Sequence, residues 1–239
     1  MIQGRCNVDV QEEEVFTPLF ISAQNGHASV TKQLIQARCN VDFQEKHGFT
    51  PLVIVTHNGH ATVTEKLIEA RCNVDVQTKT GSTPLYFAAE NGHAAVTKHL
   101  IEARCNVDLQ RKNGYTPLYI TTEKGYSSVV KPLIEDRCEV DQTKTGLTPL
   151  FISVRKEHAL VTEQLIEALC NVNLQYFQGF TSLYTETQNG HVSVTKQLIE
   201  AHCSGVNPVF VPTWIFRQPM GPHRSTLQPK VGMRPSRSS

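Results

Sequence analysis

The sequence predicts an all-α fold of stacked helical repeats, and three observations support this. Thr-Pro-Leu begins at residues 17, 50, 83, 116 and 148, and Thr-Ser-Leu begins at residue 181, so all but one of the intervals are 33 residues long. Cysteine keeps the same spacing, at residues 6, 39, 72, 105, 138, 170 and 203. Apolar residues within each unit recur at helical spacing. A shared period of this length is typical of repeat proteins, in which neighbouring units bury each other's apolar faces.

The unit that begins near residue 81 illustrates the two helices of each repeat. Thr83 suits a helix N-cap, and Pro84 suits the first helical position, where its missing N–H costs nothing. The first helix carries an apolar stripe of Leu85, Ala88 and Ala89, and Gly92 ends it in a left-handed conformation. The second helix carries Val96, Leu100 and Ile101. Neither helix can bury its stripe alone, so stacking is required.

These residues resemble the ankyrin repeat family, whose unit is a turn and two helices over 33 residues with Thr-Pro-Leu. The resemblance extends to Gly-His at 26–27, 59–60, 92–93 and 190–191, and to Asn-Val-Asp at 7–9, 40–42, 73–75 and 106–108. It covers residues 1–203. The resemblance implies a curved ankyrin-repeat solenoid of six tandem units with turn tips along one edge, which acts by binding other proteins.

We expect two parts in the chain. Residues 1–203 form the repeat stack, with a partial repeat at 1–9 and repeats near 10–42, 43–75, 76–108, 109–141, 142–173 and 174–203. Residues 204–239 carry six prolines, five Lys or Arg and no Asp or Glu, which is typical of a disordered tail. Its segment 209–216, with the single Trp of the chain, is open to three interpretations: incidental apolar residues, a cap on the last repeat, or a short linear motif.

Several positions depart from the family pattern and predict local instability. Arg-Cys replaces the usual Gly-Ala after the second helix at residues 38, 71, 104 and 137, and a left-handed residue other than Gly costs about 1 kcal/mol. Pro132 falls inside a second helix, where Pro costs about 3 kcal/mol. Glu157 replaces a capping Gly, and one residue is missing after Asp141. We therefore expect the lowest local stability between residues 130 and 160.

The first five residues match only the end of a second helix, so the repeat pattern begins inside a unit. This favours the hypothesis that the chain is a fragment of a longer repeat array. The N-terminus has no secretory signal, and no apolar run is long enough for a bilayer. Lys and Arg number 23 against 22 Asp and Glu, which gives no bias towards nucleic acid or membrane. A cytoplasmic location is expected, with the nucleus as the alternative.

Cysteine and histidine recur once per repeat, and we interpret both as packing residues. Adjacent helices lie about 8–10 Å apart, which is too far for a disulfide between repeats and too far for shared metal ligands. The cysteines are expected to be buried and reduced. No phosphate-binding loop, zinc-protease motif or nucleophile elbow is present. We therefore expect no catalysis, no metal and no cofactor.

The resemblance implies a binding strip of turn tips and adjacent first-helix positions. A Lys column at the tips, beside aromatic residues that precede the Thr caps, suits an acidic and partly apolar protein segment. Without the five basic tail residues, 18 Lys and Arg remain against 22 Asp and Glu, which disfavours nucleic acid. The candidate residues are Lys46, His47, Phe49, His57, Lys79, Thr80, Glu90, Lys112, Asn113, Tyr115, Glu123, Lys144, Leu147, Arg155, Phe177 and Phe180.

The expected function is therefore that of a monomeric protein-interaction module or scaffold. Two alternatives remain open at this point. The chain could be a spacer or a fragment of a larger ankyrin repeat protein, or it could be a non-catalytic regulatory subunit of a kinase or phosphatase.

Overall fold

The computed structural model describes residues 16–141, 147–168, 170–175, 181–190 and 192–203. All regular secondary structure in these ranges is helical, which confirms the all-α prediction. The helices are α1 (Pro18–Gln24), α2 (Ala28–Gln36), α3 (Pro51–Asn58), α4 (Ala61–Glu69), α5 (Pro84–Glu90), α6 (Ala94–Glu102), α7 (Pro117–Lys124), α8 (Ser127–Glu135), α9 (Pro149–Arg155), α10 (Ala159–Glu167), α11 (Ser182–Asn189) and α12 (Val192–Cys203). The predicted tail at 204–239, with its apolar segment, lies outside the described residues.

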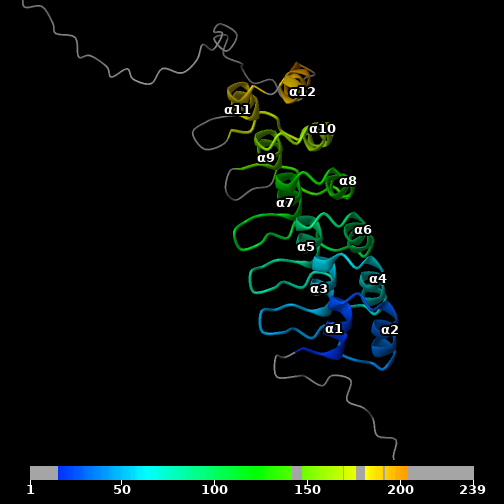
Figure 1. The fold of residues 1–239 in the computed structure, drawn as a ribbon. Coiled ribbons are helices and arrows are strands. Elements are labelled where there is room, and N and C mark those ends of the chain that lie inside the picture. Colours follow the sequence, from blue (N-terminus) through cyan, green and yellow to red (C-terminus); the bar gives the residue numbers. More distant parts are fainter. Residues whose placement is uncertain (1–15, 142–146, 169, 176–180, 191, 204–239) are drawn as a thin grey trace, which may run out of the picture. The chain divides into compact units, whose positions relative to one another are not determined.

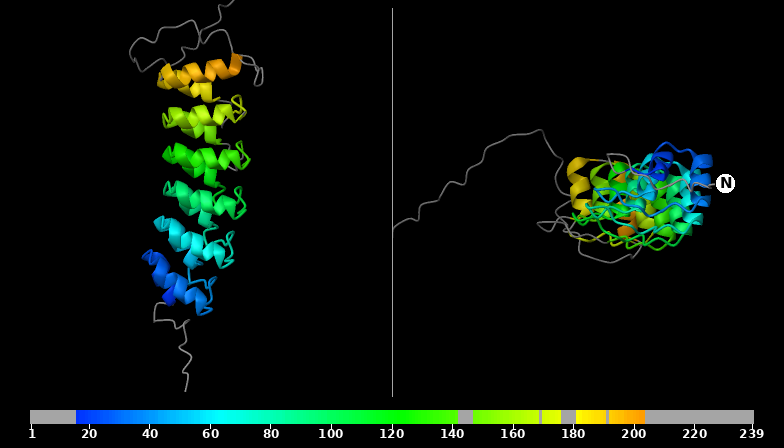
Figure 2. Two further views of the ribbon diagram at one scale, coloured as in Figure 1. Left: turned by 90° about the vertical axis from the view of Figure 1, so that its right-hand side faces the viewer. Right: turned by 90° about the horizontal axis from the view of Figure 1, so that it is seen from below.

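The helices form two rows. Each odd-numbered helix packs against the next odd-numbered helix, each even-numbered helix packs against the next even-numbered one, and each pair packs internally. Figure 1 shows the long connections projecting from the first-helix row on the side away from the second helices, and Figure 2 shows the pairs one above another. The stack therefore has a hairpin edge and an opposite face made by the second helices.

The Thr-Pro-Leu motif acts as predicted at the start of each first helix. The Thr50 hydroxyl accepts a hydrogen bond from the Val53 N–H at 3.2 Å, and the other five Thr residues of this column make the same cap. This satisfies one of the four N–H groups that a helix leaves without an internal partner. The Leu of the motif is fully buried in the described repeats from Leu19 to Leu150, so the motif both starts the helix and anchors the core.

The Gly-His pair holds each repeat to the one before it. The His60 Nε2 lies 3.1 Å from the Gln24 carbonyl oxygen, and the His93 Nε2 lies 3.0 Å from the His57 carbonyl oxygen. The ring also covers the glycine of the preceding repeat, because a Cβ on Gly59 would lie 2.6 Å from the His93 ring. His60, His93 and His158 of this column therefore have the packing role expected from the sequence.

The Asn-Val-Asp segments form a second ladder between repeats. The Asp42 Oδ1 accepts a hydrogen bond from the backbone N–H of Asn73 at 2.8 Å, and Asp75 repeats this contact with Asn106 at 2.8 Å. Within each segment the Asn side chain accepts from the N–H of the Asp two residues later, as Asn73 does for Asp75 at 3.1 Å. The acidic side chain thus joins consecutive connections, which explains why it recurs in each repeat.

The irregular positions are accommodated without breaking the stack. Arg38, Arg71, Arg104, Arg137 and Glu157 adopt left-handed backbone angles, with φ between 59° and 61°, as the sequence predicts. Helix α8 continues through Pro132 from Ser127 to Glu135. Pro132 is the sixth residue of that helix, so its missing N–H leaves the Ser128 carbonyl without its internal partner. The lower stability of residues 130–160 stays a prediction.

A buried hydroxyl pair joins the two helices of some repeats. The Ser22 and Thr31 hydroxyl oxygens lie 3.0 Å apart, and the Ser153 and Thr162 hydroxyl oxygens also lie 3.0 Å apart. In the third repeat Ala88 replaces the serine, and the buried Thr97 hydroxyl has no hydrogen-bond partner among the described residues. A buried hydroxyl without a partner costs free energy.

Ala88→Ser is expected to raise the free energy of unfolding by about 1 kcal/mol, because the new hydroxyl can bond to Thr97 as in the two intact pairs. Urea unfolding followed by circular dichroism measures this change. The same substitution in a Thr97→Val background is the control and should lose most of the gain. An equal gain in both backgrounds would show that the pair is not the cause.

Cysteines 39, 72, 105, 138 and 170 are buried and form no disulfide among the described residues. Burial, together with the Asp75 carboxylate, raises the pKa of the Cys105 thiol from its ordinary 9.0 to about 12. Burial raises the pKa of Cys72, Cys138 and Cys170 to about 12 in the same way. These thiols therefore hold almost no thiolate at neutral pH and react poorly.

We expect the five thiols to resist a thiol-specific reagent at pH 8 in the folded chain and to react fully after unfolding, as scored by mass spectrometry of each cysteine. Rapid native labelling of Cys72 or Cys105 would contradict the burial.

The raised thiol pKa also links the stability of the fold to pH. As the pH rises, the unfolded chain loses its thiol protons before the folded chain does. The contribution of the buried thiols to stability is therefore complete below pH 9 and is lost as the pH rises towards about 12.

Candidate functional site

The long connections end in tight turns at residues 45–49, 78–82 and 111–115. At the first turn the Glu45 N–H donates to the Phe49 carbonyl oxygen at 2.9 Å, and the Gly48 N–H donates to the Glu45 carbonyl oxygen at 2.8 Å. The Glu45 carboxylate also accepts from the N–H groups of His47 and Phe49, at 2.7 and 2.9 Å. Gly48 has a φ of 85°, which a residue with a Cβ rarely adopts. The same two backbone hydrogen bonds recur in the turns at 78–82 and 111–115, so hydrogen bonds within each turn define the backbone of its tip.

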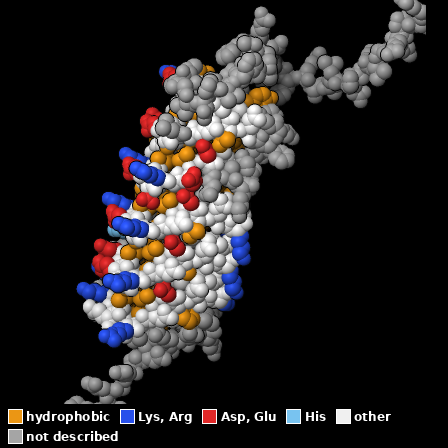
Figure 3. Space-filling model, turned by 180° about the vertical axis from the view of Figure 1, so that it is seen from behind, with side chains coloured by type: hydrophobic (Ala, Val, Ile, Leu, Met, Phe, Trp, Pro, Cys, Tyr) orange, Lys and Arg blue, Asp and Glu red, His pale blue; other side chains and the backbone are white. Residues whose placement is uncertain are grey.

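Neighbouring tips are hydrogen-bonded to one another. The Lys79 N–H donates to the His47 carbonyl oxygen at 3.0 Å, and the Lys112 N–H donates to the Thr80 carbonyl oxygen at 3.1 Å. The tips therefore lie directly side by side. The side chains of Lys46, Lys79 and Lys112 are all exposed there. Figure 3 shows a few Lys and Arg side chains on the hairpin edge and a larger number, mixed with Asp and Glu, on the side of the second helices. The neighbouring tips thus bring together three of the four predicted lysines.

The predicted aromatic residues beside the tips are half-buried. The Phe49 ring lies 5.4 Å from the Phe87 ring, measured between centroids. The Tyr115 ring stacks on the Tyr119 ring at 4.2 Å, and burial raises the pKa of Tyr119. These rings are partly buried against the core, so their neighbours hold them in place.

The predicted first-helix positions lie behind the tips. His57 and Arg155 are exposed, whereas Glu90 and Glu123 are partly buried. The His57 ring lies edge-on to Phe87 at 5.5 Å, and its Nδ1 lies 3.3 Å from the Asn91 amide nitrogen. The Arg155 guanidinium lies over the Phe151 ring at 6.0 Å from its centroid. The strip therefore carries both signs of charge over a largely aromatic base.

One residue of this surface was missed by sequence reasoning. The Arg111 guanidinium lies 5.4 Å from the centroid of the buried Tyr86 ring. Burial raises the pKa of Tyr86, and a hydrogen bond from Arg111 opposes this shift. Arg111 begins the third described tip, where the earlier tips have Glu45 and Thr78. Positions 45, 78 and 111 carry three different residue types, and this variation was the signal in the sequence that could have pointed to Arg111.

The remaining predicted residues complete the placement. His47, Thr80 and Asn113 are exposed at the tips. Leu147 is partly buried and packs against the cluster of Tyr119, Phe151 and Ile152. Lys144, Phe177 and Phe180 lie outside the described residues, so the strip is defined between residues 45 and 155.

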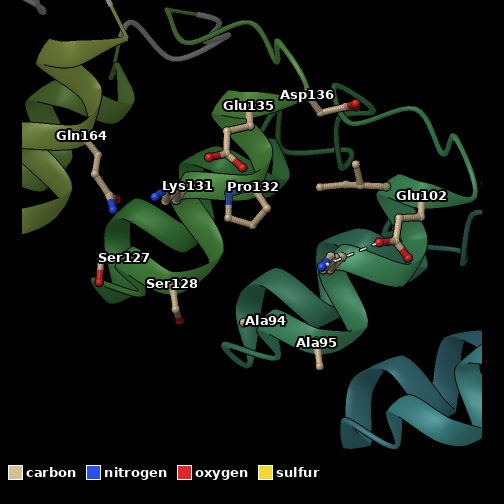
Figure 4. Close-up of a pocket in the computed structure, with 12 residues that line it drawn as sticks. Ala94, Ala95, Glu102, Ser127, Ser128, Lys131, Pro132, Glu135, Asp136 and Gln164 are labelled. Atoms are coloured by element: carbon tan, nitrogen blue, oxygen red, sulfur yellow. Dashed lines mark ion pairs between the residues drawn. The ribbon is translucent and has the colours of Figure 1, made fainter.

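A hollow lies on the opposite face, between α6 and α8. It measures about 700 Å³, and Ala94, Ala95, Ser127 and Ser128 form part of its lining. Figure 4 shows Pro132 and Lys131 on the α8 wall and the ion pair between Lys98 and Glu102 on the α6 wall, whose closest N–O distance is 3.9 Å. The sequence analysis did not predict this hollow, although the small side chains and Pro132 in one neighbourhood were visible.

Two further findings concern membrane-spanning helices and metal sites in the described ranges. None of their helices has the length and apolar character needed to cross a bilayer. No group of three His, Cys, Asp or Glu side chains in these ranges is placed to hold a metal ion.

A family model of three ankyrin repeats matches the chain at residues 1–78, 53–144 and 123–209. The chain therefore belongs to the ankyrin repeat family.

Solved structures of low sequence identity share the fold. An ankyrin repeat domain of Acinetobacter baumannii AYE is 22% identical, with a TM-score of 0.72, and the match covers 77% of this chain and 97% of that one. The ankyrin repeat domain of Bcl-3, a member of the IkappaB family, is 21% identical, with a TM-score of 0.73, and the match covers 79% of this chain and 87% of that one. No curated protein matches the chain significantly. Identities this low support the fold alone.

Proposed function

We propose that this chain is a protein-interaction module whose binding surface is the strip of hairpin tips and first-helix positions. Ankyrin repeats are in general protein-interaction modules. The observation that carries the proposal is the hydrogen-bonded row of tips, which places Lys46, Lys79 and Lys112 side by side and exposed. We propose no catalysis, because the recurring Thr caps, the Asp42 and Asp75 carboxylates and the His60 and His93 rings make structural hydrogen bonds.

The chemistry of the strip favours a partner segment that is acidic and partly apolar. Three ammonium groups in a row attract carboxylates, and the half-buried edges of Phe49 and Tyr115 offer apolar contact beside them. Exposed ion pairs contribute about 0–1 kcal/mol each, so the row acts mainly on association rate and on choice of partner. Binding should weaken as salt screens the row.

The test compares two triple variants with the same change of charge. The tip variant carries Lys46→Glu, Lys79→Glu and Lys112→Glu. The control carries Lys32→Glu, Lys98→Glu and Lys131→Glu, three exposed lysines of one column on the second helices. Circular dichroism first establishes that both remain helical. Affinity capture from a cell lysate, followed by titration with the recovered protein, then measures binding.

We expect the tip variant to lose its partner and the control to retain it. Loss in the control alone would move the binding surface to the second helices and overturn the proposal. Kinase or phosphatase activity that co-purifies with the wild-type chain, and is lost with the tip variant, would identify the module as a regulatory subunit of such an enzyme. We propose the cytoplasm or the nucleus as its location, which microscopy of a fluorescent fusion would test.

A further inference from the structure

The first described repeat exposes a side chain that all later repeats bury. The column formed by Val63, Val96, Val129, Val161 and Val194 is 0–2% exposed, whereas Val30 in α2 is 46% exposed. Val194 is buried although it belongs to the last described repeat, so a following repeat is not required to bury this column. We infer that the preceding repeat buries it. The α1–α2 end of the stack therefore presents a face that normally contacts a preceding repeat, and we name it the N-terminal face.

The histidine column gives the same result. His60, His93 and His158 each place the Nε2 atom about 3 Å from a carbonyl oxygen of the preceding first helix, at 3.1, 3.0 and 3.1 Å. The His27 ring is exposed and makes no such bond among the described residues. The N-terminal face thus offers both an apolar side chain and an imidazole whose usual contacts are absent from the described ranges.

The α11–α12 end presents the complementary surface, which we name the C-terminal face. A Cβ on Gly26, Gly59, Gly92 or Gly125 would lie 2.6–3.1 Å from the His or Tyr ring of the following repeat, whereas no described atom lies within 4 Å of that point on Gly190. A hollow of about 600 Å³ opens beside Gly190. Val192, which is 81% exposed, lines it.

An internal contact shows what the C-terminal face is shaped to receive. The α6 wall of the hollow between α6 and α8 includes Ala94, Lys98, Ile101 and Glu102, and α8 packs beside it. Figure 4 labels Ala94 and Glu102 on this wall. In the repeat alignment these four positions correspond to Val192, Lys196, Ile199 and Glu200, which line the hollow at α12. The α12 surface therefore has the columns that elsewhere receive the next second helix. No described helix follows α12 on this surface.

We propose that this chain associates head to tail with a second copy of itself. The N-terminal face of one copy docks on the C-terminal face of the other, with its His27 over the partner's Gly190 and its Val30 against the partner's α12. The contact continues the interface that already joins the repeats within each chain. This departs from the monomer expected from the sequence. Because the two faces differ, a pair of copies keeps one unoccupied N-terminal face and one unoccupied C-terminal face. Further copies can therefore add in a row.

The association is independent of the proposed binding strip. The strip lies on the hairpin edge, whereas the two faces lie at the ends of the stack. A variant of either end face should leave partner capture by the tips intact, and the tip variant should leave self-association intact. Failure of one proposal therefore does not imply failure of the other.

The test uses the full chain and three single variants. Val30→Glu blocks the N-terminal face, and Val192→Glu blocks the C-terminal face. Leu160→Glu is the matched control, because Leu160 is 66% exposed on α10, inside the stack. Sedimentation equilibrium from micromolar to millimolar concentration gives the mass of each, against 26.7 kDa for one copy. If circular dichroism shows loss of helix in a Glu variant, the Lys variant at that position replaces it.

We expect the mass of the wild type and of Leu160→Glu to rise with concentration beyond that of two copies, whereas each end-face variant stays at one copy. An equimolar mixture of Val30→Glu and Val192→Glu should form pairs and nothing larger, because only one intact face remains on each. A wild type that stays at one copy, a mixture that stays at one copy, or loss of association in Leu160→Glu would each overturn the proposal.

Discussion

Gly59→Ala is expected to lower the free energy of unfolding by about 3–6 kcal/mol. Gly59 ends α3 with a φ of 81°, and a Cβ there would lie 2.6 Å from the His93 ring. An alanine in this conformation costs about 1–2 kcal/mol. Displacing the ring adds about 1–3 kcal/mol of overpacking and weakens the hydrogen bond from His93 to the His57 carbonyl, whose net value is about 1 kcal/mol.

Gly190→Ala is the matched control for this prediction. Gly190 has nearly the same backbone conformation, with a φ of 82°, but no described atom lies within 4 Å of the point that an alanine Cβ would occupy. It should therefore show only the conformational cost of about 1–2 kcal/mol. Urea unfolding of both variants measures the difference. Equal losses would mean that the His93 ring is not the reason why position 59 requires glycine. In that case a Gly59→Ala/His93→Ala double variant would recover none of the lost free energy of unfolding.

Replacing Arg38, Arg71, Arg104 and Arg137 together by glycine is expected to stabilise the stack by about 4 kcal/mol. All four residues have φ angles of 59–61°, and each left-handed residue other than glycine costs about 1 kcal/mol. All four side chains are exposed, and none forms an ion pair within the described ranges. The four sites belong to different repeats, so their effects should add.

The control for this variant replaces the same four residues by alanine. Alanine removes the charge but keeps the Cβ, so the free energy of unfolding should change by less than about 0.5 kcal/mol per site. Thermal and urea unfolding of the two quadruple variants separates the causes. A similar gain from alanine would show that charge, and not backbone conformation, limits stability at these positions.

The fold could be predicted because the repeat signals act locally. Thr50 caps α3 and Gly59 ends it through contacts within a few residues, so their spacing alone defines the helix. The contacts between repeats were not predicted. The hydrogen bond from Asn73 to Asp42 spans 31 residues, and the covering of Gly59 by His93 spans 34. The sequence shows that these residues recur but not which partner each one meets.

The candidate surface could be predicted only in outline. The row of Lys46, Lys79 and Lys112 followed from the period, because residues in one column meet when repeats stack. The contact between Arg111 and Tyr86 joins two neighbouring repeats and depends on how far the Arg111 side chain extends. The repeat period alone does not predict such a contact. The hollow between α6 and α8 depends on small side chains from two helices, and its shape emerges only when they pack.

The most direct test of the binding strip is site-specific photocrosslinking to a bound partner. A photoreactive amino acid replaces His47 at a tip in one variant and Ser128 beside the α6–α8 hollow in another, and both positions are exposed. We expect the captured partner to crosslink through position 47 and not through position 128. Crosslinking through position 128 alone would place the partner on the second helices and would mean that the hairpin tips are not the binding surface.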